Sequence, residues 1–221
     1  MSMYVADHMT RDPVAVGPDL SIAEARSILA SRDFRHLPVV EAGGRLVGVV
    51  TDRDLRSAYP STVLPEDRRR AALAEVERTP VRRVMSPDPA VLSPLSTLDD
   101  ALVLLDRLRV GALPVVEIGG RLVGILSIRD LIRAYGRLFG LGEKGGALVA
   151  VRDTGEADLL TRIVHVLERE GVSFTRLVRP GPEAGRGRVY VRVRTLNLRA
   201  VHAALAAAGL EVVTEGRPDV P

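Results

Sequence analysis

Residues 37–59 read LPVVEAGGRLVGVVTDRDLRSAY, and residues 113–135 read LPVVEIGGRLVGILSIRDLIRAY. The two stretches are offset by 76 positions and are identical at 16 of 23 positions without a gap. The same offset continues upstream, where Met9 matches Met85 and Asp12 matches Asp88. Two copies of one unit indicate a pseudo-symmetric pair rather than a solenoid, which needs three or more repeats.

Each copy predicts the element order β-α-β-β-α. In the first copy a short apolar stretch at 14–16 precedes a helix whose start, Ser21 with Glu24, has the spacing of a capping box. Two apolar strands then flank Gly43-Gly44, a pair typical of a tight hairpin turn, and a second helix begins at Thr51. The second copy repeats these signals at 90–92, Thr97, Asp100, Gly119, Gly120 and Ser127.

The rest of the chain is not part of the repeat. Residues 61–80 are a linker with a short helix, and the glycine-rich stretch 138–146 is a connector. Residues 147–216 predict a βαββαβ order, which suits a ferredoxin-like α+β domain. The domain boundaries expected are 1–60 and 81–137 for the two repeats, 147–216 for the third domain and 217–221 for a tail.

Composition narrows the classes of function. The 221 residues are 46% hydrophobic and 27% charged, with a net charge of only +3 although the pI is about 9.8, because arginine carries nearly all the positive charge. Aromatic residues make up 3%, so single-stranded nucleic acid, which needs stacking platforms, is not favoured as a partner. No apolar run is long enough to span a membrane and no secretory signal opens the chain. Cysteine is absent, which fits the cytoplasm.

The stretch Gly48-Val49-Val50-Thr51-Asp52-Arg53-Asp54, repeated at 124–130, is the most informative for chemistry. A hydroxyl lies where a buried strand turns into a helix, and a carboxylate follows one turn later. One interpretation is that Thr51 and Asp54 cap the helix and have no other role. Alternatively, the helix N-terminus can bind a phosphate while the carboxylate accepts both hydrogens of a ribose diol. Arg35, Arg53 and Arg129 are candidates to meet the phosphate charge.

With these motifs, both repeats resemble cystathionine-β-synthase (CBS) domains over about residues 1–137. The resemblance implies an intramolecular pair that dimerises and binds AMP, ADP, ATP or S-adenosylmethionine in clefts between the domains. Thr51 and Ser127 would then meet phosphate or ribose oxygens, and Asp54 and Asp130 would hold the ribose. The residues expected to flank the base are Val14, Ala15, Pro38, Ala90, Val91 and Pro114.

The two clefts are not expected to be equal. Arg35-His36 in the first copy is replaced by Gly111-Ala112 in the second, and Asp52 is replaced by Ile128. Because a carboxylate opposes a phosphate and a guanidinium favours it, we expect unequal occupancy. His36, Ala112 and Arg129 complete the set of candidate nucleotide-binding residues.

The third domain resembles ACT domains, which are ferredoxin-like amino-acid sensors. Asp153-Thr154-Gly155 is similar to the ligand loop of that family, although its spacing is shortened, so a dimerisation domain stays an alternative. A CBS pair followed by an ACT-like domain resembles the layout of the accessory proteins of acetoin utilisation.

The sequence contains no constellation typical of a catalytic or metal site. His8, His36, His165 and His202 are scattered without paired ligand spacing, and no nucleophile elbow is present. We therefore expect a regulatory, non-enzymatic ligand sensor that acts on a partner protein. The alternative is a ligand-free dimerisation scaffold whose nucleotide clefts are vestigial.

Overall fold

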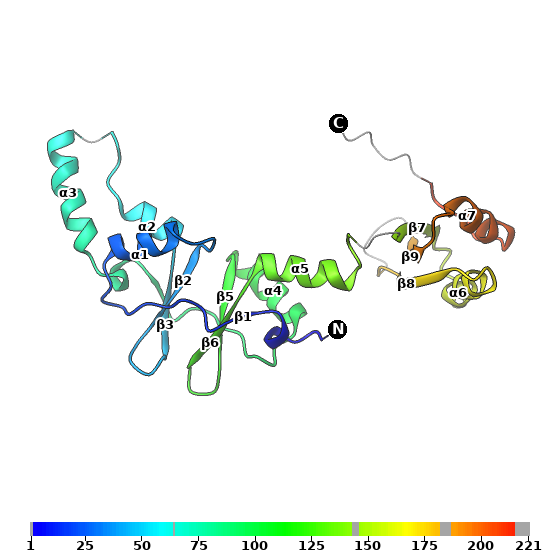
Figure 1. Cartoon of the computed structure of the whole chain (residues 1–221), viewed down its shortest axis with the longest axis horizontal. Helices are drawn as coiled ribbons and strands as arrows, with labels where there is room; N and C mark the ends of the chain where they lie inside the picture. The colour runs from blue at the N-terminus through cyan, green and yellow to red at the C-terminus, as the bar shows by residue number, and fades with distance from the viewer. Residues whose placement is uncertain (1, 64, 143–145, 182–186, 215–221) are drawn as a thin grey trace. The chain divides into compact units, whose positions relative to one another are not determined.

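The computed structural model describes residues 2–63, 65–142, 146–181 and 187–214 (Figure 1). The chain folds into two compact units, Met1–Ala134 and Tyr135–Pro221. Positions 143–145 of the expected connector, Arg186, and the tail 217–221 lie outside the described residues. The first unit contains both repeats, and the second contains the predicted third domain.

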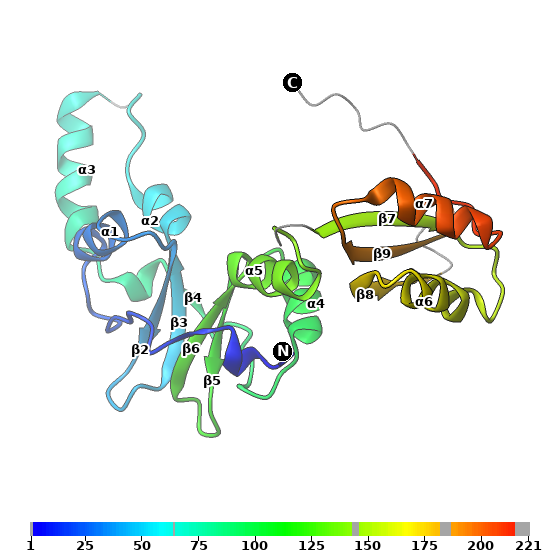
Figure 2. The same ribbon diagram turned by 45° about the vertical axis from the view of Figure 1, so that its right-hand side comes forward.

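The first unit is built on two three-stranded antiparallel sheets, whose hairpins lie side by side in Figures 1 and 2. One sheet has the order β2-β3-β4, and the other has the order β1-β6-β5. The strands are β1 (Thr10–Arg11), β2 (His36–Val40), β3 (Leu46–Thr51), β4 (Ser86–Pro87), β5 (Ala112–Val116) and β6 (Leu122–Ser127). The pairing registers are the same in the two sheets after the 76-residue offset, which confirms the predicted pseudo-symmetry.

The two repeats exchange their leading segments. β1, from the start of the first repeat, pairs with β6 of the second, and β4 from the second pairs with β3 of the first. A short 3-10 helix precedes each exchanged strand, η1 (Val5–Asp7) and η2 (Val81–Arg83). Backbone hydrogen bonds anchor the exchange, such as Val5 N to Ser96 O at 2.8 Å. Neither repeat therefore completes its sheet from its own contiguous residues.

The glycine pairs at the hairpin tips form the predicted turns. Gly43, Gly44, Gly119 and Gly120 all have positive φ, between 79° and 93°, a conformation that other residues adopt only with strain. The two tips also bind each other, because Leu46 N donates to Gly120 O and the symmetric bond joins the second hairpin to the first, each at 3.0 Å. The hairpin turns thus help to hold the two repeats together.

The helices of the first unit begin where their capping residues predict. α1 (Ile22–Ala30) and α4 (Leu98–Leu108) each start with a complete capping box. The second helix of each repeat is α2 (Asp52–Ala58) or α5 (Ile128–Leu138), directly after Thr51 or Ser127. The linker forms α3 (Glu66–Arg78), which packs on α1. Leu37, Val39, Val50 and Leu55 are buried in the core of the first repeat, together with Ile22, Ala25 and Leu29 of α1.

The second unit packs two helices on one face of an antiparallel sheet. The sheet has the order β7-β9-β8, and residue 212 extends it through a single bridge to Val151 on β7. This segment takes the place of the last strand in the predicted βαββαβ order, and two backbone hydrogen bonds support the bridge, Arg152 N to Glu211 O and Val213 N to Ala150 O, each at 2.8 Å. The elements are β7 (Gly146–Arg152), α6 (Leu159–Arg169), β8 (Ser173–Val178), β9 (Arg188–Arg194) and α7 (Leu198–Ala207). Val149, Val151, Val189, Val191 and Val193 form the sheet side of the core.

The end of α5 contacts the sheet face that the helices of the second unit leave open. Arg176 on β8 donates from Nε to Leu138 O at 2.7 Å and from Nη2 to Arg137 O at 2.9 Å. A guanidinium at a helix C-terminus satisfies carbonyls that lack a partner within the helix. The last turn of α5 is therefore capped by the C-terminal sheet, within the second unit.

No helix among the described residues combines the length and apolar character needed to cross a membrane.

Candidate functional site

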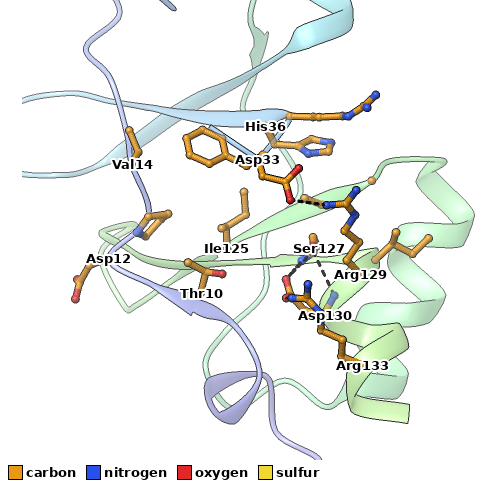
Figure 3. Close-up of a pocket in the computed structure, with 16 residues that line it drawn as sticks. Thr10, Asp12, Val14, Asp33, His36, Ile125, Ser127, Arg129, Asp130 and Arg133 are labelled. Carbon is orange, nitrogen blue, oxygen red and sulfur yellow. Dashed lines mark hydrogen bonds and ion pairs between the residues drawn. The ribbon is translucent and has the colours of Figure 1, made fainter. Parts of the chain in front are cut away.

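A pocket of about 530 Å³ lies between the two repeats (Figure 3). Four segments of the chain surround it: the strand and loop that precede α1, the turn between α1 and β2, the start of β5, and the junction of β6 with α5. Its lining residues are Thr10, Asp12, Pro13, Val14, Asp33, Phe34, Arg35, His36, Gly111, Ala112, Ile125, Ser127, Ile128, Arg129, Asp130 and Arg133. The first two segments belong to the first repeat, so the pocket requires the pair.

The junction of β6 and α5 places a hydroxyl and a carboxylate together in this pocket. Asp130 Oδ2 accepts hydrogen bonds from Ser127 N at 2.9 Å and from Ser127 Oγ at 2.6 Å. In return, Ser127 Oγ accepts from Asp130 N at 3.3 Å. The same reciprocal pattern occurs at Thr51 with Asp54 and at Thr97 with Asp100. The geometry therefore shows the capping role directly, and a ligand-binding role requires further support.

The position of Ser127 and Asp130 in the pocket supports a ligand-binding role. Thr97 and Asp100 do not line the pocket, whereas Ser127 and Asp130 do. The capping bonds engage Oδ2 of Asp130, and its Oδ1 lies 3.6 Å from Nη1 of Arg133. The side chain of Asp130 keeps a relative exposure of 16%, so a ligand in the pocket can reach it.

Three arginines and three aspartates line the pocket. Arg129 pairs with Asp33 across the two repeats at 3.3 Å, as the dashed line in Figure 3 shows. Arg133 lies beside Asp130. Within the described part of the chain, Arg35 has no side-chain hydrogen bond or ion pair and is exposed. Arg35 is therefore the cation most ready to meet an anionic ligand.

His36 is the only histidine in the pocket lining. Burial lowers the pKa of His36, and the guanidinium of Arg35 lowers it further, while the carboxylate of Asp54 raises it. A lowered pKa keeps the imidazole neutral at pH 7. The ring packs against Gly111, where an added Cβ would lie 2.9 Å from Cε1. This contact explains the difference between the repeats, because glycine at 111 makes room for the histidine at 36.

The pocket brings together seven of the residues selected from the sequence: Val14, Arg35, His36, Ala112, Ser127, Arg129 and Asp130. Pro38 and Pro114 instead lie within β2 and β5, and they are buried. Thr51 and Asp54 cap α2, with Arg53 exposed beside them. Ala15, Ala90 and Val91 lie in the loops that precede α1 and α4. A ligand-binding role stays a prediction for these eight residues and for the seven that line the pocket.

Sequence reasoning missed several lining residues, among them Thr10, Asp33, Phe34 and Arg133. Thr10 reaches the pocket because β1 is exchanged onto the second repeat. Asp33 is equivalent to Arg109 after the 76-residue offset. Because these two residues have opposite charges, the comparison of the repeats did not identify either of them as a site residue. Helical spacing was a usable signal for Arg133, which lies three residues after Asp130 on α5.

In the part of the chain that the structure describes, no three His, Cys, Asp or Glu residues are grouped so that they could hold a metal ion.

Comparison with known families and relatives agrees with this architecture. The model of the CBS domain matches residues 5–61 and 81–137, just over half of the chain. A CBS domain-containing protein of Dictyostelium discoideum is 32% identical over 132 residues, which cover 60% of this chain and 90% of that protein. An inosine-5'-monophosphate dehydrogenase of Korarchaeum cryptofilum is 29% identical, but the match covers only 32% of the enzyme.

Solved structures similar to this chain include CBSX2 in complex with AMP, with a TM-score of 0.53 and 29% identity over 62% of this chain and 99% of that one. A putative acetoin utilization protein (AcuB) from Vibrio cholerae has a TM-score of 0.54 and 28% identity, covering 65% of this chain and 98% of that one. The CBS domain pair of MJ0100, in complex with 5'-methylthioadenosine and S-adenosyl-L-methionine, has a TM-score of 0.51 and 25% identity, covering 61% and 97%. The repeats, their pairing and the family match together show that this chain belongs to the CBS-domain family.

Proposed function

We propose that this protein is a regulatory sensor that binds an adenine nucleotide or a related adenosyl ligand between its two CBS domains. The observation that carries the proposal is the inter-repeat pocket, in which Ser127, Asp130 and Arg35 converge. The similar CBS-pair structures with AMP, and with 5'-methylthioadenosine and S-adenosyl-L-methionine, support an adenosyl ligand.

Each part of such a ligand has a chemical counterpart in the pocket. The apolar side chains of Val14, Phe34 and Ile125 suit a flat base. The carboxylate of Asp130 can accept hydrogen bonds from a ribose diol. A phosphate would meet the start of α5 at Ser127, where the helix dipole favours negative charge, and the guanidinium of Arg35.

A second cleft is proposed on the opposite side of the pair. The pseudo-symmetry places Thr51 and Asp54 in the position of Ser127 and Asp130, with the same capping geometry. Ala90 and Val91 would face the base there, as Val14 would in the first cleft, with Ala15 next to it in the chain. Pro38 and Pro114 would support the strands behind the two bases.

Thermal unfolding of the full chain against AMP, ADP, ATP, S-adenosylmethionine and NAD tests the proposal. A ligand at 100 times its Kd stabilises the folded state by about 2.7 kcal/mol per site. We expect at least one adenosyl ligand to raise the Tm in this way. If none of the five shifts the Tm, the alternative of a ligand-free scaffold with vestigial clefts replaces the sensor.

The proposed role is regulatory and not enzymatic. The matches to inosine-5'-monophosphate dehydrogenases cover only a part of those enzymes, so their activity does not transfer to this chain. We place the protein in the cytoplasm, where adenosyl ligands are available, acting on a partner protein that its sequence does not identify. A bound nucleotide that is consumed during long incubation would contradict this assignment.

We further propose a homodimer formed through the second repeat. Both of its helices expose apolar side chains, Leu102 and Val103 on α4 and Ile128 and Ile132 on α5. The equivalent positions of the first repeat are polar: Arg26, Ser27, Asp52 and Arg56. Since an exposed apolar face marks an interaction site, the second repeat is the side expected to meet another copy.

Ile132→Arg, which introduces the residue found at position 56, is expected to dissociate the dimer, because it places a guanidinium in an apolar contact. Sedimentation equilibrium of the variant and of the wild-type protein measures this change. Arg69→Ala on α3, a linker-helix substitution, serves as the control. A monomeric wild-type protein would contradict the proposal.

We assign the second unit to the ferredoxin-like, ACT-like class because of its strand order, 212-β7-β9-β8, with both helices on one face. We propose no amino-acid ligand for it. The carboxylate of Asp153 is held by a two-point contact with Arg179, at 2.6 and 2.7 Å, and also accepts from Gly155 N. These bonds lower the pKa of Asp153 and leave the carboxylate engaged.

We propose that α5, which continues from the first unit into the second, passes a change at the pocket on to the second unit. The helix starts at Ile128, directly after Ser127 in the pocket, and its last carbonyls, of Arg137 and Leu138, accept from Arg176 within the second unit. A ligand that favours one arrangement of the repeats can shift the equilibrium only by its difference in affinity for the two arrangements. A small-angle scattering profile that does not change at saturating ligand would contradict such a shift.

A further inference from the structure

We propose that Asp33 limits the charge of the ligand in the pocket, so that the pocket selects a nucleoside monophosphate over a triphosphate. This inference rests on the proposed function and names the ligand class for one of its clefts. Asp33 is a specificity-determining residue in this account. Its carboxylate forms an ion pair with Arg129, which keeps that guanidinium from a phosphate, and it repels the negative charge of additional phosphates.

The charges around the pocket are balanced before any ligand binds. The three guanidinium groups, of Arg35, Arg129 and Arg133, are matched by three carboxylates. Two of the three arginines are already beside a carboxylate, Arg129 at 3.3 Å from Asp33 and Arg133 at 3.6 Å from Asp130. One phosphate carries a charge of about −1.5 to −2 at pH 7, and each additional phosphate adds more. Arg35 and the start of α5 can meet the first phosphate, but few cations are left for others.

Asp33 lies at the rim of the pocket, next to Arg129. Its side chain is 97% exposed, yet it reaches from the turn after α1 to α5 of the other repeat. An exposed ion pair of this kind contributes little to stability. Figure 3 shows Asp33 and Arg129 pointing toward each other, whereas Asp12 lies on the other side of the pocket and points away. Asp33 is thus the carboxylate that a phosphate chain reaching for Arg129 would meet.

The other repeat has no carboxylate at the position of Asp33. At the positions equivalent to Asp33 and Arg129, the chain has Arg109 and Arg53. In the described part of the chain, neither of these two arginines has a side-chain hydrogen bond or ion pair, and both are exposed. A carboxylate at this place is therefore not needed by the fold. The carboxylate of Asp33 occurs in one cleft only. It forms a pair without net charge with Arg129, whereas the equivalent positions in the other cleft hold two cations.

Calorimetric titration of the full chain with AMP, ADP and ATP tests this assignment. The binding event in the pocket is identified as the one that Asp130→Ala removes. The wild-type pocket is expected to bind AMP more tightly than ATP. Asp33→Asn is expected to tighten ATP binding about fivefold and to change AMP binding less than twofold, since one exposed charge interaction corresponds to at most about a fivefold change. Asp33→Arg, the residue of the other repeat, should tighten ATP binding further.

Asp67→Asn on α3 is the matched control, because it removes an exposed carboxylate that does not line the pocket. The effect of Asp33→Asn should decrease between 0.05 and 0.5 M salt, where the Debye length falls to about 4 Å. Equal wild-type affinities for AMP and ATP, or an Asp33→Asn variant that tightens both equally, would overturn the inference alone. If no nucleotide shows an event that depends on Asp130, the proposed function fails and the inference fails with it.

Discussion

Asp130→Ala is expected to remove the part of the thermal response that comes from ligand in the described pocket, about 2.7 kcal/mol of stabilisation at a ligand concentration of 100 times the wild-type Kd, and to leave any response of the proposed second cleft. In the proposed function the carboxylate of Asp130 accepts hydrogen bonds from the ribose diol, and alanine offers no replacement. The same substitution removes a helix cap, because Asp130 Oδ2 accepts from Ser127 N and Oγ. The unliganded protein should therefore also lose about 1 kcal/mol of stability.

The chain provides a matched control that separates the two effects. Asp100 accepts from Thr97 N at 2.9 Å and from Thr97 Oγ1 at 2.7 Å, nearly the same distances as at Asp130, but it does not line the pocket. Asp100→Ala should cost a similar amount of stability and keep the full response to ligand. If both variants keep the response, Asp130 is a capping residue only and the ligand is not bound through it.

Gly124→Ala is expected to destabilise the first unit by about 1–3 kcal/mol, the usual cost of overpacking a core. A Cβ at this position of β6 would collide with the Met9 side chain, at 3.0 Å from Cγ, and lie 3.1 Å from Thr10 O. Thr10 belongs to β1, the strand exchanged between the repeats. The methyl group would therefore loosen the exchanged strand. Chemical denaturation measures the change in the free energy of unfolding.

Two other glycines calibrate this result. Gly48→Ala should cost the same amount, because its Cβ would meet Met85 and Ser86 O at the same distances. Gly17→Ala should change stability by less than about 1 kcal/mol, since nothing lies within 4 Å of the added atom. A Gly124→Ala variant as stable as Gly17→Ala would show that the exchanged strand adapts without cost.

Local signals in the sequence predicted most elements of the fold. The capping spacings at Ser21 and Thr97 located helix starts, and the paired glycines located both hairpins. These signals succeed because they depend on a few neighbouring residues. The last strand of the predicted order is present only as a bridge of residue 212 to β7 with two backbone hydrogen bonds beside it, because an apolar run alone does not say how far a segment will pair.

The site was harder to predict than the fold. Ser127 and Asp130 were found because their motif is local. Thr10 and Asp33 were not, because a repeat offset states which positions are equivalent but not on which copy each segment packs. A contiguous pair and an exchanged pair have the same sequence pattern, and only the three-dimensional pairing of β1 with β6 distinguishes them.

The exchange of leading segments has a consequence for the history of the fold. A single repeat ending near residue 61 would contain β2 and β3 but not the strand that completes their sheet, which comes from residues 86–87. Such a one-repeat polypeptide could complete its sheet only by trading its first strand with an identical molecule. Gene duplication and fusion would then have turned a two-chain swap into an intramolecular one. The two halves, produced as separate polypeptides cut within the 61–80 linker, should accordingly reassemble by fragment complementation.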